Sequence, residues 1–339
     1  MNLNASASIA TGTLLRRKLL ACAALLTVAA GAMLAAPAHA AYPDKPVHLL
    51  LSFPPAGATD VLARAIGQKM SEALGQSVIV ENRPGAGGNI GLIAAARAPA
   101  DGYTIYLGAV TNAAIAAAAY SAQPAHLLRD FVPVAGVGTV PHILVVPQST
   151  PARNVSELVS YLKAAPGKYN FASQGPGTLS HLESELFKIR TGVDVLHVPY
   201  KGSSQALPDL IAGSSAMMFD SIPASMPHVK AGKLRVLAVA SGKRVSSLPD
   251  VPTVQEAGVP GFEANNLFGF VVPKGTPAPA IKALSAAIQS AVTAPGMREA
   301  MEAQGVELKF TPAAEFGRMM DQEFSVWGKV VEAAKVKLD

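Results

Sequence analysis

The chain has 339 residues, half of them hydrophobic and 15% charged, and its formal net charge is +5. The basic residues are scattered at low density, which excludes the basic stripe with interleaved aromatic residues that is typical of a nucleic-acid-binding protein. The only cysteine is Cys22, so we expect neither a disulfide framework nor a thiolate metal site, and the chain folds by its hydrophobic core alone.

Residues 1–40 have the pattern of a secretory signal peptide. The cationic Arg16-Arg17-Lys18 leads into an apolar segment over residues 19–34, and Ala38-His39-Ala40 is the small-x-small pattern that a signal peptidase cuts after. The apolar segment is too short and too rich in alanine for a strong membrane span, which must cross about 30 Å of hydrocarbon. Cys22 follows the charges too closely for a lipoprotein signal. We expect export, by the general or the twin-arginine route, with cleavage between Ala40 and Ala41.

The 299 residues that follow are enough for a sizeable core and, on length alone, for two domains. Three of the 28 basic residues and none of the 23 acidic residues lie before Ala41, so this part of the chain has a net charge of +2. The basic character of the whole chain is therefore due partly to the signal peptide.

From residue 41 onward, short apolar runs rich in β-branched residues alternate with helical patterns. This alternation predicts parallel sheets joined by crossover helices. The predicted strands cover residues 47–52, 77–80, 104–107, 143–146, 169–171, 216–219, 234–240 and 268–272. Between them we expect helices such as those over residues 61–74, 155–164, 182–190, 204–212 and 278–292.

Two apolar stretches, residues 140–146 and 267–272, each end in Val-Pro and are predicted to cross between two domains. Such a pair of crossings encloses the middle of the chain and joins the two ends. We therefore expect residues 41–142 and 266–339 to form domain 1, and residues 143–265 to form domain 2.

The first candidate ligand loop is SFPPAGATD, over residues 52–60. Prolines and a glycine stop the strand, and Thr59 is a suitable N-cap for the helix that follows. In an open α/β sheet such loops at the carboxyl ends of strands bind ligands, and free amides at a helix start attract an anion. A well-capped turn with no ligand explains the same residues equally well.

The second candidate loop is SQGPGTLSHLE, over residues 173–183. Ser180 and Glu183 have the spacing of a capping box, which leaves Ser173, Gln174 and Thr178 free to offer hydrogen bonds outward. His181 lies in the first helical turn, where the helix dipole disfavours a charged imidazole. A neutral, packed histidine is the favoured interpretation.

The sequence offers little support for an enzyme. It has no Gly-x-Ser-x-Gly elbow, and the histidines at 48, 126, 142, 181, 197 and 228 never pair at the three- or four-residue spacing of a metal site. Asp220 ends an apolar strand, where its carboxylate is either a turn-former, the favoured interpretation, or an acceptor for a ligand amine. We expect no catalytic residue, no metal and no cofactor.

The glycine-rich stretch VENRPGAGGNIG, residues 80–91, resembles a phosphate loop only in outline. A dinucleotide fingerprint requires Gly-x-Gly-x-x-Gly, but after Gly85 and Gly87 the third position is Ile90. The stretch is therefore predicted to be a tight turn between strand and helix that supports the neighbouring ligand loop.

Taken together, the loops resemble the substrate-binding proteins of tripartite tricarboxylate transporters, also called the Bug family of periplasmic solute receptors. The resemblance covers nearly all of the chain after the signal peptide, in order. It rests on YPDKPVHLLLSFPPAGATD, VENRPGAGGNIG, PADGYT, DFVPV, PGKYNFASQGPGTLSHLESELF, HVPYKGSSQALPDLIAG, FDSIPAS, HVKAGKLRVLAVAS, LPDVPTVQEAGVPGF and EFSVWGKVV.

The resemblance implies an α/β fold, a two-lobed periplasmic binding protein of the type II, Venus-flytrap class. Each lobe is then a mostly parallel sheet flanked by helices, with the two crossing strands as the hinge. The implied function is a non-enzymatic periplasmic receptor that closes over a small carboxylate, which can be a di- or tricarboxylate, an aromatic acid or an amino acid. It delivers this ligand to the membrane subunits of a transporter, and we expect a monomer.

Two alternatives to a transport receptor stay open. One is an exported hydrolase that uses His181 and Asp220 as base and orienter. The other is a ligand sensor that acts on a membrane signalling partner.

The resemblance also implies which residues contact the ligand, through backbone amides, hydroxyls and ordered water more than through arginine. On the first lobe these are Phe53, Pro54, Ala58, Thr59, Asp60, Thr111 and Asn112. On the second lobe they are Ser173, Gln174, Gly177, Thr178, Tyr200, Lys201, Gly202, Asp220 and Ser221.

Three departures from the family pattern make the identity of the ligand its least transferable property. Ala56 replaces a glycine of the first loop, and Ala116-Ala117 replaces an Asn-Pro before Tyr120. Leu267 stands where many members of the family have a tryptophan.

Overall fold

A computed structural model describes residues 42–338 of the chain. The predicted signal peptide and its cleavage site lie outside the described residues. Among the residues described, no helix combines the length and the apolar character that crossing a bilayer requires.

Ten strands form one continuous sheet in the order β2-β1-β3-β9-β4-β7-β5-β6, with β8 and β10 pairing in addition with β4. Their bounds are β1 (Val47–Leu51), β2 (Val78–Asn82), β3 (Thr104–Ala109), β4 (Phe131–Pro147), β5 (Tyr169–Ser173), β6 (Val195–Pro199), β7 (Met217–Ser221), β8 (Leu234–Val239), β9 (Asn265–Pro273) and β10 (Glu307–Pro312).

Eleven α-helices and a short 3₁₀ helix, η1, connect and cover these strands in the described part of the chain. Their bounds are α2 (Ala58–Leu74), η1 (Ala86–Gly88), α3 (Asn89–Ala96), α4 (Val110–Ala119), α5 (Leu127–Asp130), α6 (Val155–Lys163), α7 (Leu179–Thr191), α8 (Ser203–Ile211), α9 (Ile222–Lys230), α10 (Ala278–Val292), α11 (Met297–Glu302) and α12 (Ala313–Ala333).

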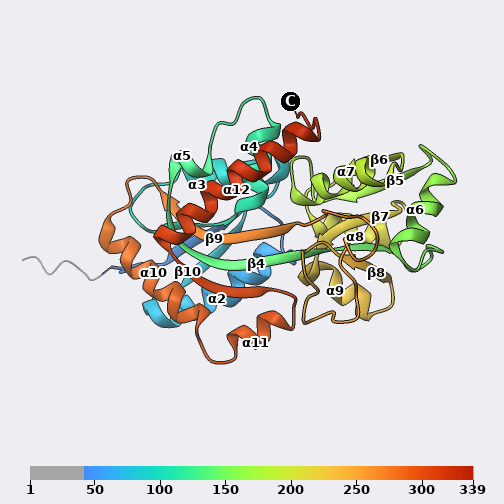
Figure 1. The fold of residues 1–339 in the computed structure, drawn as a ribbon. Coiled ribbons are helices and arrows are strands. Elements are labelled where there is room, and N and C mark those ends of the chain that lie inside the picture. Colours follow the sequence, from blue (N-terminus) through green and yellow to red (C-terminus); the bar gives the residue numbers. More distant parts are fainter. Residues whose placement is uncertain (1–41, 339) are drawn as a thin grey trace, which may run out of the picture. The chain divides into compact units, whose positions relative to one another are not determined.

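Strand β4 carries the sheet from one half to the other. Residues 131–141 pair with β9, whereas residues 142–147 pair with β7 and β8. Figure 1 shows β4 passing from the side of α2, α10 and α11 to the side of α6, α8 and α9. We call the part built on β1–β3, β9, β10 and residues 131–141 of β4 the first lobe. The part built on β5–β8 and residues 142–147 of β4 is the second lobe.

Each lobe contains a parallel core extended by antiparallel strands. In the first lobe β1 pairs in parallel with β2 and β3, and in the second lobe β5 pairs in parallel with β6 and β7. Parallel strands require crossover helices, which explains the alternation of strand and helix patterns along the sequence. Register shifts where β4 pairs with β9 and β8 indicate bulges, which bend a strand and increase its twist.

Separate apolar clusters stabilise the two lobes. In the first lobe the cluster joins β1, α2 and α10 through residues such as Leu49, Ile66 and Ile288. In the second lobe it includes Phe171 and Phe219. Burial of one such side chain stabilises the fold by about 1.5–3 kcal/mol, so each cluster can hold a lobe together without disulfides.

The C-terminal helix α12 links the lobes. It packs along α4, as Figure 1 shows, and adds Trp327 and Val331 to the apolar cluster of the second lobe. Beyond the helix, the amide of Leu338 donates a hydrogen bond of 2.8 Å to the carbonyl of Ala119 at the end of α4. The C-terminal segment therefore connects the lobes in addition to the two strands that cross between them.

The eight predicted strands are all present, and all except β4 lie within a few residues of their expected bounds. The sequence did not predict β6 and β10, and it assigned only the last part of β4. The five predicted helices correspond to α2, α6, α7, α8 and α10.

Candidate functional site

The loops at the carboxyl ends of the strands meet around a small cavity of about 20 Å³. Both lobes contribute to its wall, which brings together segments far apart in the sequence. The lining residues are Phe53, Pro54, Gly57, Ala58, Thr59, Asn112, His142, Gln174, Ser203, Ser221, Asn266 and Phe268.

Four helices begin at this cavity. Ala58 and Thr59 open α2, Asn112 lies in the first turn of α4, Ser203 opens α8, and Ser221 is the N-cap of α9. Within the described residues none of the four N-termini has a hydrogen bond from its N-cap side chain. Unpaired amides and the positive ends of helix dipoles make such an N-terminus a binding site for anions. The helix N-termini therefore offer groups that favour an anion, although no lysine or arginine lines the cavity.

The start of α2 differs from the sequence-based prediction. The N-cap is Gly57, not Thr59, which lies inside the helix as its second residue. Thr59 is consequently not the cap, and it lines the cavity together with Gly57 and Ala58.

Asp60 supports this loop from behind. Its carboxylate accepts hydrogen bonds from the Ala56 amide at 3.1 Å, Arg64 Nε at 2.9 Å and Asn82 Nδ2 at 3.1 Å. Burial alone raises the pKa of Asp60, but these hydrogen bonds outweigh burial and lower it. Asp60 does not line the cavity, and it fixes the backbone of the residues that do.

Ala56, one of the departures from the family pattern, adopts a φ of +67°. A glycine adopts this left-handed conformation freely, whereas other residues lose about 1–2 kcal/mol there. The hydrogen bond from its amide to Asp60 holds the strained conformation. The departure therefore keeps the loop geometry at a cost in stability.

On α4, Asn112 and Thr111 have different roles. Asn112 Oδ1 accepts a hydrogen bond of 2.8 Å from the Leu179 amide at the start of α7, so its NH₂ group is the donor available to the cavity. The Thr111 hydroxyl bonds to Glu323 on α12 and accepts from the Leu267 amide. Thr111 thus lies behind the cavity wall and joins α4 to β9 and α12.

Asp220 is the centre of a buried hydrogen-bond network in the second lobe. Its Oδ1 accepts from Gln174 Nε2 at 2.8 Å and from Ser203 Oγ at 2.6 Å, and its Oδ2 accepts from Ser225 Oγ at 2.6 Å. Gln174 and Ser203 line the cavity, whereas Asp220 does not. The carboxylate therefore orients two polar residues of the cavity wall.

Ser173 and Thr178 brace the loop between β5 and α7. The N-cap of α7 is Thr178, whose Oγ1 accepts from the His181 amide and donates to the Gly175 carbonyl. The predicted capping box of Ser180 and Glu183 is therefore wrong, since both lie inside the helix. Ser173 Oγ forms a hydrogen bond of 2.6 Å with His197 Nε2.

His181 is buried and stacks on His197, with ring centroids 4.0 Å apart. Burial lowers the pKa of His181. Burial and the neighbouring His181 together lower the pKa of His197 to about 3. Both rings are therefore neutral at physiological pH, which agrees with the prediction of a neutral, packed His181.

The remaining predicted residues lie at the edge of the site. Tyr200 donates a hydrogen bond of 2.7 Å to Asp209, and Lys201 is exposed. Gly202 contacts the first lobe, because a Cβ atom at this position would lie 2.6 Å from the Pro54 ring. Of the sixteen predicted residues, seven line the cavity: Phe53, Pro54, Ala58, Thr59, Asn112, Gln174 and Ser221.

Five lining residues were not predicted, namely Gly57, His142, Ser203, Asn266 and Phe268. A signal was present for two of them. His142 and Asn266 are polar residues within or beside the apolar crossing segments, where a purely structural strand has no need of them. His142 is buried, and its Nδ1 lies 2.7 Å from Oε2 of the buried Glu183.

The two lobes touch beside the cavity at several points. Gly202 packs on Pro54, and Asn112 bonds to the start of α7. Gly87, in the glycine-rich stretch, abuts the carbonyl oxygen of Pro176 so closely that a Cβ atom would overlap it. The glycine-rich stretch is thus a contact surface between the lobes as well as a turn.

Gly177 lies beside another family departure. A Cβ atom on this glycine would lie 3.1 Å from the Tyr120 ring and 3.6 Å from Cα of Ala116. The departure at Ala116-Ala117 therefore lies where the end of α4 comes close to the loop before α7.

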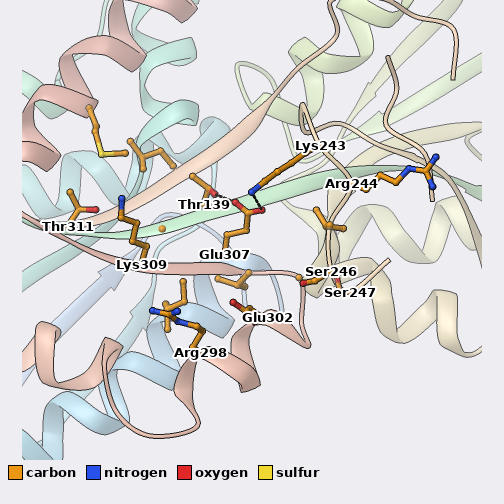
Figure 2. A pocket seen from close by; sticks show the side chains of 17 residues that line it. Thr139, Lys243, Arg244, Ser246, Ser247, Arg298, Glu302, Glu307, Lys309 and Thr311 are labelled. Carbon is orange, nitrogen blue, oxygen red and sulfur yellow. Dashed lines mark hydrogen bonds and ion pairs between the residues drawn. The ribbon is translucent and has the colours of Figure 1, made fainter. Parts of the chain in front are cut away.

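A larger and more open pocket of about 630 Å³, here called the hinge pocket, lies beside β4, β9 and β10. Figure 2 shows it between β10 and α11 on one side and the loop of residues 243–247 on the other, with Lys243 reaching Glu307. That ion pair has an N–O distance of 3.6 Å, and both side chains are exposed. Leu267, a family departure, lines this pocket and not the cavity. Arg298 in the first turn of α11 also lines the larger pocket, whereas four helix N-termini meet at the smaller cavity, which is therefore the candidate ligand site.

No group of three or more acidic or histidine side chains with the geometry to hold a metal ion occurs between residues 42 and 338. The polar residues of the cavity wall are amides, hydroxyls and one histidine. The arrangement is suited to binding an anion by hydrogen bonds.

Two relatives are similar over most of their length. The chain is 41% identical over 292 residues to a "UPF0065 protein in tcbD-tcbE intergenic region" of Pseudomonas sp. (strain P51), covering 86% of this chain and 87% of the relative. It is 38% identical over 324 residues to protein BugT of Bordetella pertussis, covering 95% of this chain and 98% of the relative.

Solved structures agree with the fold. Rpa4515 of R. palustris, described with adipate, has a TM-score of 0.83 at 36% identity, over 87% of this chain and 98% of that one. The periplasmic binding protein BugD has a TM-score of 0.83 at 34% identity, over 87% and 99%. MatC (Rpa3494) of Rhodopseudomonas palustris, described with bound malate, has a TM-score of 0.80 at 31% identity, over 86% and 100%.

The family model for the "Tripartite tricarboxylate transporter family receptor", TctC, matches residues 62–336. Members of this family are non-enzymatic periplasmic solute receptors with the two-lobed α/β fold of periplasmic binding proteins. The chain belongs to the tripartite tricarboxylate transporter receptor family, the Bug family of solute receptors.

Proposed function

We propose that the chain captures a small carboxylate between its two lobes and delivers it to the membrane subunits of a tripartite tricarboxylate-type transporter. The observation that carries this proposal is the convergence of four helix N-termini on one cavity. The adipate and malate of the related structures support the same ligand class.

The donors of the cavity suit a carboxylate without a cationic side chain. The first amides of α2 and α8, the hydroxyls of Thr59 and Ser221 and the amide of Asn112 can all donate to carboxylate oxygens. One helix dipole contributes about 0.3–1 kcal/mol to binding an anion, and up to about 2 kcal/mol where the site is partly buried. Bridging waters can complete the contacts, at an entropic cost of at most about 2 kcal/mol each.

The dimensions of the cavity support capture by hinge motion. A volume of about 20 Å³ is close to that of one water, far too small for a dicarboxylate. The lobes must therefore separate to admit a ligand and close again around it. Closure of this kind is a population shift, which requires the ligand to bind the closed form better than the open form.

We place the hinge where β4 and β9 cross between the lobes. This gives domain 1 as residues 41–142 with 266–339, and domain 2 as residues 143–265. Two features lie within one residue of these bounds. The main partner of β4 changes from β9 to β7 between Pro141 and His142. The amide of Ala264 donates a hydrogen bond to the carbonyl of Ala240 in the second lobe, whereas the next residue, Asn265, pairs with Pro141 of the first lobe.

The predicted site residues divide into two groups by their contacts. We propose that the seven lining residues contact the ligand directly or through water. The others act by holding loops in place, as Asp60, Thr111, Ser173, Thr178 and Asp220 do through their hydrogen bonds. Gly177, Tyr200, Lys201 and Gly202 belong to the rim of the cleft.

We further propose that the chain is exported as a monomer, with cleavage between Ala40 and Ala41. A hydrolase using His181 and Asp220 is disfavoured by their contacts. His181 stacks on His197, while Asp220 accepts its hydrogen bonds from Gln174, Ser203 and Ser225. Among the described residues no hydrogen bond joins the two proposed catalytic groups.

A denaturation screen tests the proposed function. We expect a di- or tricarboxylate, an aromatic acid or an amino acid to raise the free energy of unfolding by about 2.7 kcal/mol when present at 100 times its dissociation constant.

The Ser221 hydroxyl is buried without a hydrogen-bond partner in the described part of the chain. Ser221→Ala should therefore leave the unliganded protein as stable as before while weakening ligand binding about 2- to 10-fold.

Ser247→Ala is the matched control for this variant. Its hydroxyl is also buried and unpartnered among the described residues, but it lies in the hinge pocket and not at the cavity. Its ligand affinity should equal that of the wild type. If no compound of the panel stabilises the wild-type protein, the proposed function is contradicted.

A further inference from the structure

His142 lies at the point where β4 leaves the first lobe and enters the second. Its side chain is 1% exposed and lines the ligand cavity. Its Nδ1 is bonded to Oε2 of Glu183 on α7, which is itself fully buried. A buried imidazole with one nitrogen fixed in this way has its other nitrogen, Nε2, available to the cavity.

Two other polar residues lie beside His142. Ser221 is its register partner on the antiparallel strand β7, so their side chains are neighbours on one face of the sheet. Asn266 lies on β9, next to the residue that pairs with Pro141. We call His142, Ser221 and Asn266 the hinge floor.

The hinge floor has more polar groups than the protein itself satisfies. Ser221 Oγ and Asn266 Oδ1 are buried, and neither has a hydrogen-bond partner among the described residues. Unpaired buried polar atoms are rare in native proteins, and each one calls for an explanation. Here both atoms belong to residues that line the ligand cavity, which points to a ligand group as the partner of each. The Ser221 hydroxyl can donate to a carboxylate, whereas Asn266 Oδ1 can only accept from a donor group of the ligand.

The contacts of His142 decide what it offers to a ligand. Burial raises the pKa of Glu183, and the neighbouring His142 opposes this shift. The ionised carboxylate can only accept hydrogen bonds, and in that form it holds the proton on Nδ1. The titratable groups that face His142 are Glu183 from α7 and Asp220 from β7. Burial opposes the charge, but these carboxylates outweigh burial and raise the pKa of His142. In the imidazolium form Nε2 is a second donor, able to bind an anionic group.

The cavity therefore contains two sets of groups for binding an anion. The helix N-termini of α2, α4 and α8 form one set, and His142 Nε2 with the Ser221 hydroxyl forms the other. A ligand with one carboxylate satisfies one set and leaves the other buried and unpaired, which weakens binding. A ligand with two carboxylates satisfies both.

Resting on the proposed function above, we propose that His142 is a specificity-determining residue, whose Nε2–H binds the second carboxylate of a dicarboxylate ligand and selects it over monocarboxylates. Glu183 is then a positioning residue, which orients the imidazole without touching the ligand. The hinge floor thus supplies the specificity, and the helix N-termini supply the general affinity for carboxylates.

The wild-type protein gives the first test by isothermal titration calorimetry. The probes are dicarboxylates of four to six carbons, from succinate to adipate, and the monocarboxylates of equal length, from butyrate to hexanoate. We expect the best dicarboxylate to bind at least about 10-fold more tightly than its monocarboxylate counterpart. A monocarboxylate that binds as tightly as the dicarboxylate of equal length would overturn the proposal.

Two variants of His142 then separate its two nitrogens. In His142→Asn the side-chain amide nitrogen takes the place of Nδ1, so the bond to Glu183 is kept and the donor at the cavity is lost. In His142→Gln the amide nitrogen takes the place of Nε2, so a donor at the cavity is kept. We expect His142→Asn to lower the preference for the dicarboxylate about 10-fold. In His142→Gln it should fall by less than about 3-fold, because a neutral donor remains.

The outcomes distinguish this inference from the proposed function. If the wild type binds dicarboxylates and His142→Asn keeps the same preference, the role of His142 is refuted while the receptor function stands. If no carboxylate of any class binds the wild type, the proposed function fails and this inference with it. Should His142→Asn not fold, Ser221→Ala takes its place, because it removes the donor beside His142. An unchanged preference of Ser221→Ala for the dicarboxylate would then refute selection by the hinge floor.

Discussion

Asp220 is fully buried, and its carboxylate accepts hydrogen bonds from Gln174, Ser203 and Ser225. From the sequence, this acid at a strand end is a turn-former or an acceptor for a ligand amine. In the structure it orients Gln174 and Ser203, which line the cavity, and it also bonds to Ser225, which does not. A sequence reveals the residue type and the strand end, but not that three donors from separate elements converge on it.

The stacked pair of His181 and His197 makes the stability of the protein depend on pH. Burial lowers the pKa of both rings, that of His197 to about 3, whereas an unfolded histidine titrates near 6.5. Below about pH 6.5 the unfolded chain therefore binds more protons than the folded protein. Their contribution to stability is complete above this pH and decreases as the pH falls, by at most about 1.4 kcal/mol per pH unit for each histidine.

Urea denaturation of the wild type and of His197→Gln between pH 7.5 and 5.0 measures this effect. The glutamine keeps a polar group near Ser173 but does not titrate. We expect the wild type to lose more stability than the variant on acidification, and the comparison removes the contributions of all other titrating groups. Parallel pH profiles for the two proteins would show that the stacked pair does not titrate as described.

At the scale of elements, the glycine-rich stretch illustrates what the sequence can reveal. The failed fingerprint correctly predicts a turn, and the structure has η1 and α3 there. The contact of Gly87 with Pro176 joins segments almost ninety residues apart in the sequence, across the two lobes. No local pattern contains that information, because it depends on how the lobes pack.

We predict that Gly87→Ala weakens ligand binding by opposing closure. Gly87 has a φ of +61°, and a Cβ atom would overlap the Pro176 carbonyl, so the lobes cannot approach as closely. A clash that costs the closed form about 1.4 kcal/mol lowers the affinity tenfold. Calorimetric titration of the variant measures this loss.

Gly213→Ala is the matched control. Its φ is +80°, so alanine is strained there as well, but a Cβ atom would have no neighbour within 4 Å. Both variants should lose about 1–2 kcal/mol of stability through backbone strain, and only Gly87→Ala should lose affinity. Equal affinities for the two variants would show that the Gly87 contact plays no part in closure.

The missed strands and misplaced caps have physical causes. β6 is a sheet edge with an exposed Leu196, and β10 mixes charged and apolar residues, so neither has a strong apolar run. β10 is recognisable only by its pairing with β4. Several residues near each helix start are suitable caps by type. The backbone makes Gly57 the N-cap of α2 and Thr178 the N-cap of α7.

At the scale of the whole molecule, the order of the loops along the chain was enough to predict the family and the α/β fold. The two crossings were also visible as apolar stretches. The full extent of β4 was not visible in the sequence. Its first part contains prolines and glycines, which are untypical of a strand, and it pairs with β9 through bulges. The link made by α12 between the lobes depends on contacts between distant segments, which a sequence pattern does not encode.

The hinge pocket in Figure 2 contributes little to closure. The Lys243–Glu307 ion pair joins the lobes there, but both side chains are exposed. Exposed ion pairs contribute about 0–1 kcal/mol and are screened by salt. The lobes are joined more extensively by α12, by the contact of Gly305 with Ile222 and by the loop contacts beside the cavity.

The most direct test of capture by closure is the distance between two spin labels, one on each lobe, measured by pulsed electron paramagnetic resonance. Cys22, the only cysteine, precedes the proposed cleavage point, so Ala73→Cys on α2 and Ser156→Cys on α6 would be the only labelled positions in the exported chain. Both residues are exposed.

With a saturating dicarboxylate we expect a single narrow distance distribution. Without it we expect a broader distribution with a different mean, because the open form must be populated to admit the ligand. Identical distributions with and without ligand, at concentrations where calorimetry shows full binding, would contradict capture by closure of the two lobes.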